Sequence, residues 1–562
     1  MSTLPPLSRR RLPVPLPSPW FWGLVVLYVL LGLVGHDPWK GDDAIGFGIA
    51  WNMANGTWGD WLLPNVAGQL VAEEGPLAFW LAALFIKALS GVLEAHDAAR
   101  LATAVWTSIA IIAVHRAARR LDGEAAGRLA VLALLATLGL LARSHEIAAE
   151  PAFLAGWALV LWSLALGREF GFKGALLLAA GLAVCYLSRG MTPTRVVLLT
   201  ILVTWLALRR GESWSGGFGG ARDAVWKIGA FVAAHLLFLA WALSATANAA
   251  FHDLYRNWGE AQFGWPGASA WTWYAKTLPW FVFPAWPIAL WWVLHRRPVK
   301  LLDVYPVPPV QHLPVAATLC VLASLAWSPQ ASEAVLLPIV VPLAILIAPG
   351  LKFLRRGFAA LTDWFGRLAF TLAAALVWLG YVAMQTGTPP RIAANLARLE
   401  PGFVATLQWP ALAIAIAATL AWCVAIARSE RTPLRGIVHW CYGVTLVWLL
   451  LMTLFLPWVD YGRSYRGVAA GMQAAMGVSQ GAVSAQSTRG CVNSRDLGLS
   501  ERASFAYFAR LKYGAPGAAC PWLLVQGTRG QPTRSEPGYR LVWEGNRPGD
   551  RNERFRLYRR TP

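Results

Sequence analysis

The sequence is dominated by long apolar runs that alternate with short stretches of polar and basic residues. Each run has about 17 to 22 residues, the length that an α-helix needs to cross the hydrocarbon layer of a membrane. Strands of a membrane barrel would alternate apolar and polar positions with a period of two, and these runs do not. The pattern therefore predicts an all-α polytopic membrane protein, because lipid forces the backbone to satisfy its own hydrogen bonds.

Basic residues mark one side of the predicted membrane domain. Three arginines at 9–11 precede the first run, and clusters such as 115–120 follow later ones. Because Lys and Arg are enriched in cytoplasmic loops, we place these clusters in the cytoplasm and most loop carboxylates on the outer side. The alternation predicts about thirteen spans, with the two ends of the chain on opposite sides. The expected spans lie near residues 20–35, 98–114, 128–142, 152–167, 174–187, 193–208, 226–249, 274–294, 312–327, 334–350, 367–385, 410–427 and 437–457.

The same pattern divides the chain into three regions. We expect residues 1–19 to be a cytoplasmic lead-in without a cleavage site, because a long apolar run follows directly. Residues 20–457 are the predicted transmembrane domain. Its first outer loop, 36–97, can hold helices at 44–55 and 76–90, and we place the second at the membrane interface rather than across it.

Residues 458–562 are the predicted soluble extracytoplasmic C-terminal domain. A helix is expected at 500–512 and strands at 522–526, 539–543 and 554–559, which indicates a small α/β domain. Cys491 and Cys520 share this polar tail and can form a disulfide if it lies outside the cytoplasm. The other four cysteines lie in or beside apolar runs, where they are expected to be buried hydrophobic residues.

Composition agrees with a membrane protein and argues against a nucleic-acid-binding protein. The chain is 57% hydrophobic and 14% charged, against about 25% charged residues in soluble domains. The net charge of +20 could suggest nucleic acid, but the basic residues are scattered over short loops beside apolar runs. We therefore assign them to membrane topology and expect no nucleic-acid partner. Many of the 32 tryptophans are expected at the membrane interface.

The first outer loop is unusually acidic between residues 36 and 80. It contains six carboxylates and a single basic residue, Lys40. A loop at a membrane surface does not need so many acids for solubility, whereas chemistry could use them as bases or metal ligands. The acids are Asp37, Asp42, Asp43, Asp60, Glu73 and Glu74.

Three short motifs in this loop carry a resemblance. They are Asp-Asp-Ala at 42–44, Gly-Asp-Trp-Leu-Leu-Pro at 59–64, and the stretch from Gly68 to Leu77 that contains Glu73. This order resembles the first outer loop of the superfamily of lipid A aminoarabinose transferases and protein O-mannosyltransferases. The resemblance implies a C-type glycosyltransferase fold that uses lipid-phosphate-linked sugars. Two departures are Glu74, where the family has a Lys that is expected to meet phosphate, and Gly75, where the family has Pro.

Asp42 is the position that matches the catalytic base of the family. An acceptor hydroxyl is a poor nucleophile near neutral pH, so a carboxylate must take its proton during attack on the anomeric carbon. Asp43 is adjacent, and repulsion between the two charges would raise one of the two pKa values. The choice between Asp42 and Asp43 stays open at this point.

Further acids follow the motif. Glu73 is expected to orient the acceptor or bind a divalent cation, and Glu74 to do either. Glu150 matches an acidic position of the family in the next outer loop, with His145 five residues before it. A His beside carboxylates can ligate a metal or relay a proton. We therefore expect a substrate site with Glu150 and, as a possible cofactor, a divalent metal held by Glu73 and His145.

Three cations complete the predicted site. Arg189 lies in Leu-Ser-Arg-Gly, which resembles a family stretch with Lys at the same position. A cation on the outer side runs against the basic-inside trend, so we expect it to meet a departing lipid phosphate. Arg256 and Lys276 are weaker candidates of the same kind, and all three are assigned to substrate binding.

The resemblance implies a bacterial inner-membrane glycosyltransferase that acts on lipid A or another cell-envelope glycan. It would move a sugar from a polyprenyl-phosphate donor to a hydroxyl of a glycolipid, glycan or protein, with inversion and as a monomer surrounded by membrane lipids. A secondary transporter or lipid flippase is the alternative, but transporters carry inverted repeats and charges at mid-membrane, and none is visible. A non-catalytic scaffold is a further alternative. The sequence contains no Gly-rich phosphate loop and no Cys/His zinc spacing.

Overall fold

The computed structural model describes residues 16–561, with gaps at 168–169, 210–220, 295–308, 352–353, 355, 430–431, 478–490, 516, 529–535 and 551. Many of the basic residues that predict the topology lie outside the described residues. They fall within residues 1–15 and 295–297 or are Arg168, Arg210, Lys352, Arg355 and Arg431.

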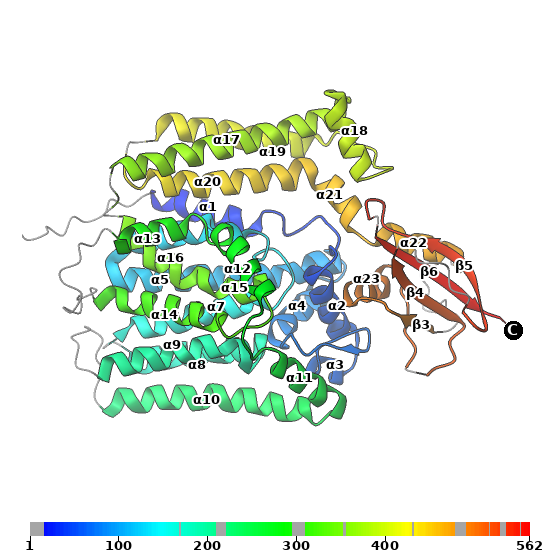
Figure 1. Cartoon of the computed structure of the whole chain (residues 1–562), viewed down its shortest axis with the longest axis horizontal. Coiled ribbons are helices and arrows are strands. Elements are labelled where there is room, and N and C mark those ends of the chain that lie inside the picture. Colours follow the sequence, from blue (N-terminus) through cyan, green and yellow to red (C-terminus); the bar gives the residue numbers. More distant parts are fainter. Residues whose placement is uncertain are drawn as a thin grey trace, which may run out of the picture.

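Most of the chain forms long helices that run side by side, with a small sheet beyond one end of the bundle (Figure 1). The described ranges contain six stretches of helix that are long and apolar enough to cross a membrane, and six shorter apolar helices of 10–17 residues. The predicted all-α polytopic character is therefore confirmed, whereas the number of thirteen spans is not. The bundle helices are α1 Ser18–Leu30, α5 Ala95–Ala136, α7 Glu150–Ala165, α8 Gly171–Arg189, α9 Met191–Arg209, α10 Ala221–Thr246, α14 Pro309–Leu325, α16 Val340–Gly350, α17 Arg356–Thr386, α19 Trp409–Arg428 and α20 Arg435–Leu450.

Shorter elements connect these helices. They are α6 Leu138–Leu141, α15 Glu333–Leu336, a 3₁₀ turn Leu337–Ile339, a π-helical turn Leu451–Phe455, α21 Leu456–Arg463 and α22 Arg466–Ala475.

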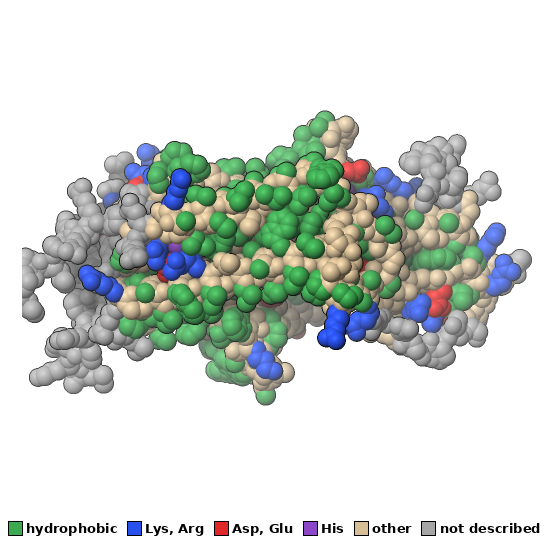
Figure 2. Space-filling model, turned by 90° about the horizontal axis from the view of Figure 1, so that it is seen from above, with side chains coloured by type: hydrophobic (Ala, Val, Ile, Leu, Met, Phe, Trp, Pro, Cys, Tyr) green, Lys and Arg blue, Asp and Glu red, His purple; other side chains and the backbone are tan. Residues whose placement is uncertain are grey.

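Hydrophobic side chains cover the flanks of the bundle. On the face in Figure 2 they lie over its middle, and most Lys and Arg side chains lie nearer its ends. Large apolar residues are more than half exposed on α10 and α17, among them Leu236, Leu243, Leu361 and Leu376. Such faces suit contact with lipid tails, because isolated soluble proteins rarely expose apolar surface of this extent.

Helix α5 contains the predicted span 98–114 and most of the predicted span 128–142. Its backbone leaves the helical conformation at Asp122 and Gly123, and Gly123 has φ of +86°. Glu124, just after this turn, pairs with Arg119 just before it at 3.1 Å. Gly127 lies against the main chain of His115, so the two arms fold back on each other as a helical hairpin.

The prediction of one span at 274–294 was wrong. The chain forms α12 Ala268–Phe281 and α13 Ala285–Leu294, with a break at 282–284. Pro284 lies in the break; it has no N–H, and its ring disfavours helical geometry at Phe283. The apolar run continues across the break, which is why hydropathy alone did not detect it.

Two predicted loops are helices. α11 Ala249–Ala261 replaces the loop after the 226–249 span, and α18 Pro390–Leu399 lies within the predicted loop 390–408. Both have many polar residues, yet their apolar residues recur at helical spacing, for example at Ile392, Leu396 and Leu399. Each is an amphipathic helix that follows a long bundle helix, α10 or α17.

The C-terminal region contains the predicted helix and all three predicted strands. The four strands form one sheet in the order β3-β4-β6-β5, in which β3 and β4 are parallel and the other pairs antiparallel. The elements are β3 Val492–Arg495, α23 Leu499–Phe508, β4 Trp522–Thr528, β5 Tyr539–Gly545 and β6 Glu553–Arg560.

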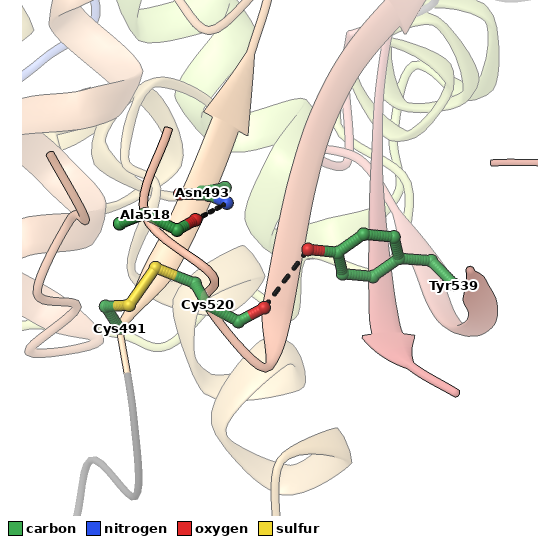
Figure 3. The surroundings of a disulfide bond; sticks show 5 residues. All are labelled: Cys491, Asn493, Ala518, Cys520 and Tyr539. Carbon is green, nitrogen blue, oxygen red and sulfur yellow. Dashed lines mark hydrogen bonds between the residues drawn. A yellow bond between two sulfur atoms is a disulfide. The ribbon is translucent and has the colours of Figure 1, made fainter. Parts of the chain in front are cut away.

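The disulfide expected from the sequence is present between Cys491 and Cys520 (Figure 3). It ties the residue before β3 to the turn before β4. Two hydrogen bonds hold the same turn: Asn493 donates to the Ala518 carbonyl at 2.8 Å, and the Tyr539 hydroxyl donates to the Cys520 carbonyl at 3.1 Å.

The predicted first outer loop is a compact subdomain between the bundle and the C-terminal domain (Figure 1). Its core is formed largely by α2, α4 and α23, and it includes Phe47, Phe79, Ala503 and Tyr507. The expected helix at 76–90 is confirmed as α4, although its depth relative to a membrane stays a prediction. The elements are α2 Asp42–Asn55, α3 Trp58–Leu62, the two-stranded pair β1 Asn65–Val66 and β2 Gln69–Leu70, and α4 Leu77–Leu89.

Candidate active site

Asp42 is the first residue of α2. Gly41 precedes it with φ of +110°, a backbone conformation that favours glycine. The Asp42 side chain is 50% exposed and forms an ion pair with Arg143. Asp42 is therefore held by a cation but remains open to solvent on its other side.

Asp43 has the opposite surroundings. Only 4% of it is exposed, and its carboxylate accepts hydrogen bonds from Arg100 at 2.8 Å and from the Ile147 N–H at 3.0 Å. A third bond comes from the Trp39 N–H at 3.1 Å. Burial alone would raise the pKa of Asp43, but the Arg100 guanidinium and these donors hold it below its usual value. Asp43 is thus a buried structural anion with its oxygens occupied.

Arg143 joins acids from three separate parts of the chain. Besides Asp42 it contacts Glu146 at 3.1 Å and Glu333, the first residue of α15, at 3.2 Å. Burial raises the pKa of Glu146 to about 8, although Arg143 opposes this; repulsion from Asp43 and Asp42 adds to the rise. One cation cannot fully neutralise three carboxylates, and the raised pKa of Glu146 relieves part of this excess.

Arg189 forms a second centre at the end of α8. Its Nη1 atom lies 2.8 Å from Glu74 and 3.3 Å from Glu150. Burial raises the pKa of Glu74 to about 8, Arg189 opposes the rise, and Glu150, Asp42 and Glu73 reinforce it. The two arginine centres are therefore parts of one electrostatic cluster.

A cavity opens beside the Arg189 centre. Glu150 and Arg189 line it together with Arg195, Gln262 and Ser328. Arg195 donates to the Gln262 carbonyl at 3.0 Å, and its guanidinium lies over the Phe263 ring. Two guanidinium groups in one cavity can bind an anion such as a phosphate.

Two carboxylate oxygens near this cavity have no hydrogen-bond partner among the described residues. Within the described part of the chain, Glu74 Oε2 and Glu150 Oε2 are buried and have no hydrogen-bond partner. Buried polar atoms are nearly always paired in folded proteins. An unpaired carboxylate oxygen beside a cavity can accept a hydrogen bond from a hydroxyl or amino group of a ligand.

His145 does not fit the predicted metal role. It is buried, with Nδ1 2.6 Å from the Leu141 carbonyl and Nε2 2.8 Å from the Tyr28 carbonyl. Glu73 is exposed on a different loop. The described ranges contain no group of three or more His, Cys, Asp or Glu side chains placed to hold a metal ion.

The two weaker cation candidates lie at the surface. Arg256 is 60% exposed on α11 and lies 3.8 Å from Glu260. Lys276 is exposed on α12. Neither residue lines the cavity. The structure therefore brings together Asp42, Glu74, Glu150 and Arg189 from the predicted set, while Arg256 and Lys276 lie apart.

Sequence reasoning missed Arg143, Glu146, Glu333 and Arg195. Arg143 carried a usable signal, since it is a cation on the predicted outer side, the argument that singled out Arg189. Glu333 and Arg195 offered no such signal, because their partners are remote in sequence: Arg143 and Glu333 are 190 positions apart.

Comparisons with known proteins give a family model and several relatives. A family model described as dolichyl-phosphate-mannose-protein mannosyltransferase matches residues 73–217. Two relatives from Pseudomonas aeruginosa strains UCBPP-PA14 and PAO1 are 27% identical over 391 residues and 28% identical over 382 residues. Both are described as undecaprenyl phosphate-alpha-4-amino-4-deoxy-L-arabinose arabinosyl transferase. The matches cover 65% and 64% of this chain, and 66% and 64% of the relatives, slightly less than two thirds of their length.

The fold is also found in a solved structure. The crystal structure of ArnT from Cupriavidus metallidurans bound to undecaprenyl phosphate superposes with a TM-score of 0.66 at 16% identity. The superposition covers 96% of this chain and 97% of that one.

The superposition confirms the expected fold, that of a polytopic membrane protein with the C-type glycosyltransferase fold. The resemblance to the superfamily of lipid A aminoarabinose transferases and protein O-mannosyltransferases is confirmed by the family model and by the relatives.

Proposed function

We propose that this protein is an integral membrane glycosyltransferase. It transfers a sugar from a polyprenyl-phosphate donor to a hydroxyl of a glycolipid, glycan or protein on the extracytoplasmic face. One observation carries the proposal: a half-exposed carboxylate, Asp42, lies in one electrostatic cluster with a cavity that contains two guanidinium groups. A base next to an anion site is the arrangement that this reaction needs.

Asp42 acts as the base. Its ion pair with Arg143 orients the carboxylate, and its exposed side can accept a hydrogen bond from an acceptor hydroxyl. As the hydroxyl oxygen attacks the anomeric carbon, its proton passes to Asp42. The bond between that carbon and the phosphate oxygen then breaks, so a direct displacement inverts the anomeric centre.

Arg189 and Arg195 stabilise the leaving group. Negative charge on the phosphate grows as the glycosidic bond breaks, and guanidinium groups in a partly closed cavity stabilise that charge more than water does. The unpaired oxygens of Glu74 and Glu150 are suited to the sugar, because they can accept hydrogen bonds from its hydroxyl or amino groups.

The descriptions of the relatives guide the choice of donor. They favour a pentose on undecaprenyl phosphate, such as 4-amino-4-deoxy-L-arabinose, over a hexose. Lipid A or another envelope glycan is the corresponding acceptor in a bacterial inner membrane. A divalent cation at Glu73 stays a prediction, and no step of the proposed reaction depends on it.

The disulfide also bears on the orientation of the protein in the membrane. A disulfide in the C-terminal domain supports a location outside the reducing cytoplasm. We infer that the N-terminus lies in the cytoplasm, and that the site and the C-terminal domain face the periplasm.

The test uses the full-length protein in proteoliposomes with undecaprenyl-phosphate aminoarabinose and lipid A. Mass spectrometry is expected to detect undecaprenyl phosphate together with lipid A that is heavier by one sugar. Asp42→Asn is expected to lower turnover by about 10²- to 10⁴-fold. Asp253→Asn is the matched control, because Asp253 is 66% exposed on α11, and it should keep wild-type turnover.

Two results would overturn the proposal. One is a wild-type protein that moves the intact donor across the bilayer without cleaving it, as a flippase does. The other is turnover in Asp42→Asn equal to that of Asp253→Asn.

A further inference from the structure

Lys40, two residues before Asp42, reaches out of the membrane domain into the C-terminal domain. Its ammonium group lies 2.9 Å from Glu553, 3.6 Å from Glu501 and 3.7 Å from Asp550. Glu501 belongs to α23, Glu553 begins β6, and Asp550 precedes it. A single cation from the first loop is thus bound by three carboxylates that are more than 450 residues away in the chain.

These three carboxylates are themselves fixed. Arg547 contacts Glu553 and Asp550, each at 2.6 Å. The Tyr465 hydroxyl donates to Glu501 at 2.7 Å and to Glu553 at 3.1 Å. Glu501 and Glu553 are about as buried as core residues, at 4% and 5% exposed. We call these three carboxylates, Glu501, Asp550 and Glu553, the Lys40 socket. Their own contacts fix them, so Lys40 does not pair with mobile surface side chains.

Gly41, the residue between Lys40 and Asp42, is bound by the same domain. Its N–H donates to the Ser500 hydroxyl at 3.1 Å. Gly41 has φ of +110°, a conformation that is open to glycine and costly for other residues. The direction in which α2 begins is thus fixed by a side chain of α23.

The body of α2 rests on α23 as well. A Cβ atom added at Gly48 would come within 2.5 Å of the Ala503 Cβ, so the two helices approach as closely as glycine allows. Phe47 packs edge-on against Tyr507 with ring centroids 4.8 Å apart. A shift of the C-terminal domain would therefore carry α2 with it.

We propose that the C-terminal domain positions the catalytic base. It binds Lys40 and, through Ser500, Gly41, and these two positioning residues, Lys40 and Ser500, aim the Asp42 carboxylate at the acceptor. This inference rests on the proposed function and deepens it. The domain does not have to bind donor or acceptor for this role; it sets the first turn of α2.

The kinetic consequence is specific. Displacing a base by about 1 Å can lower a rate by about 10²-fold. Lys40 and Ser500 do not line the cavity, so their loss leaves donor affinity unchanged. We expect kcat to fall at least about 10-fold in Lys40→Met, with the donor KM within about 2-fold of wild type.

The experiment measures two quantities on full-length protein in nanodiscs: kcat and KM for the donor, and hydrogen–deuterium exchange of peptides covering 38–46. The variants are Lys40→Met, Lys40→Arg and Ser500→Ala. Arg495→Met is the matched control, because Arg495 pairs with Glu536 at 2.7 Å within the same domain. Lys40→Arg keeps the charge and is expected to retain near wild-type kcat.

The expected result is lower kcat and faster exchange at 38–46 in Lys40→Met and Ser500→Ala, and neither change in Arg495→Met. The inference is overturned if wild type transfers sugar and Lys40→Met has the same kcat and exchange as Arg495→Met. A wild type that transfers no sugar overturns the proposed function instead, so the two failures are distinguishable.

Discussion

The two sides of the first turn of α2 have opposite environments. On the open side, Asp42 is half exposed and shares Arg143 with Glu146 and Glu333, so acids outnumber the cation. On the closed side, Asp43 is buried against Arg100, which is itself 0% exposed. Successive residues of a helix point about 100° apart, which is enough to place neighbouring acids in different surroundings.

This difference separates a reactive carboxylate from a structural one. Asp43 accepts three hydrogen bonds from the chain itself and has little capacity left for a substrate. Asp42 keeps an open side, and its neighbours Glu74 and Glu146 have pKa values raised to about 8. Acids with raised pKa values beside a cavity are typical of functional sites, whereas a buried ion pair with all its oxygens occupied is costly to break by removing one partner.

The largest effect is expected from a substitution at Asp43, on the closed side. In Asp43→Ala the buried Arg100 guanidinium loses its closest carboxylate, and we expect a loss of about 3 kcal/mol in unfolding free energy. Thermal unfolding in detergent measures it. The double variant Asp43→Ala with Arg100→Met should recover much of the loss, because it removes the uncompensated charge. Wild-type stability in Asp43→Ala would show that the closed side is not structural.

A smaller effect is expected at Arg195, which sequence reasoning did not identify. Arg195→Met removes one of two guanidinium groups that stabilise the leaving phosphate, so kcat/KM for the donor should fall about 10-fold, equal to about 1.4 kcal/mol, with part of the loss in kcat. Initial rates at varied donor concentration measure this. Arg398→Met, at an exposed position on α18, is the control. An unchanged kcat/KM would remove Arg195 from the phosphate site.

The smallest effect concerns pH. Burial raises the pKa of Glu74 from 4.5 to about 8, so the folded state binds this proton more tightly than the unfolded state. The stabilising contribution is complete below pH 4.5 and is lost as pH rises towards 8. Glu74→Gln should therefore reduce the fall in Tm between pH 5 and pH 8 by about 1–2 °C.

Glu260→Gln is the control for this pH dependence, because Glu260 is 71% exposed on α11. It should leave the pH slope of Tm as in wild type. A slope in Glu74→Gln as steep as in wild type would contradict the electrostatic description of the Arg189 centre.

Sequence predicted the helices well where one signal was enough. Apolar runs and flanking arginines predicted most bundle helices. Alternating apolar residues and turn residues predicted three strands of the C-terminal sheet. The break at Pro284 and the amphipathic helices α11 and α18 were missed, because the first lies inside a continuous apolar run and the others resemble polar loops.

The site was predictable only where a short motif carried it. Asp42, Glu150 and Arg189 came from the resemblance, but the choice between Asp42 and Asp43 depends on which way each side chain points. Glu333 and the Lys40 socket depend on contacts between distant segments, which no local pattern encodes. His145 looked like a ligand, yet burial places both ring nitrogens against main-chain carbonyls.

Chemical rescue tests the role of Asp42 most directly. Asp42→Gly removes the base and leaves a space that formate can enter, so added formate should restore part of the lost sugar transfer in a concentration-dependent way. Asp43→Gly should show no such recovery, since its defect is in folding. Formate that restores Asp43→Gly but not Asp42→Gly, or full activity in Asp42→Gly without formate, would contradict the assignment of Asp42 as the base.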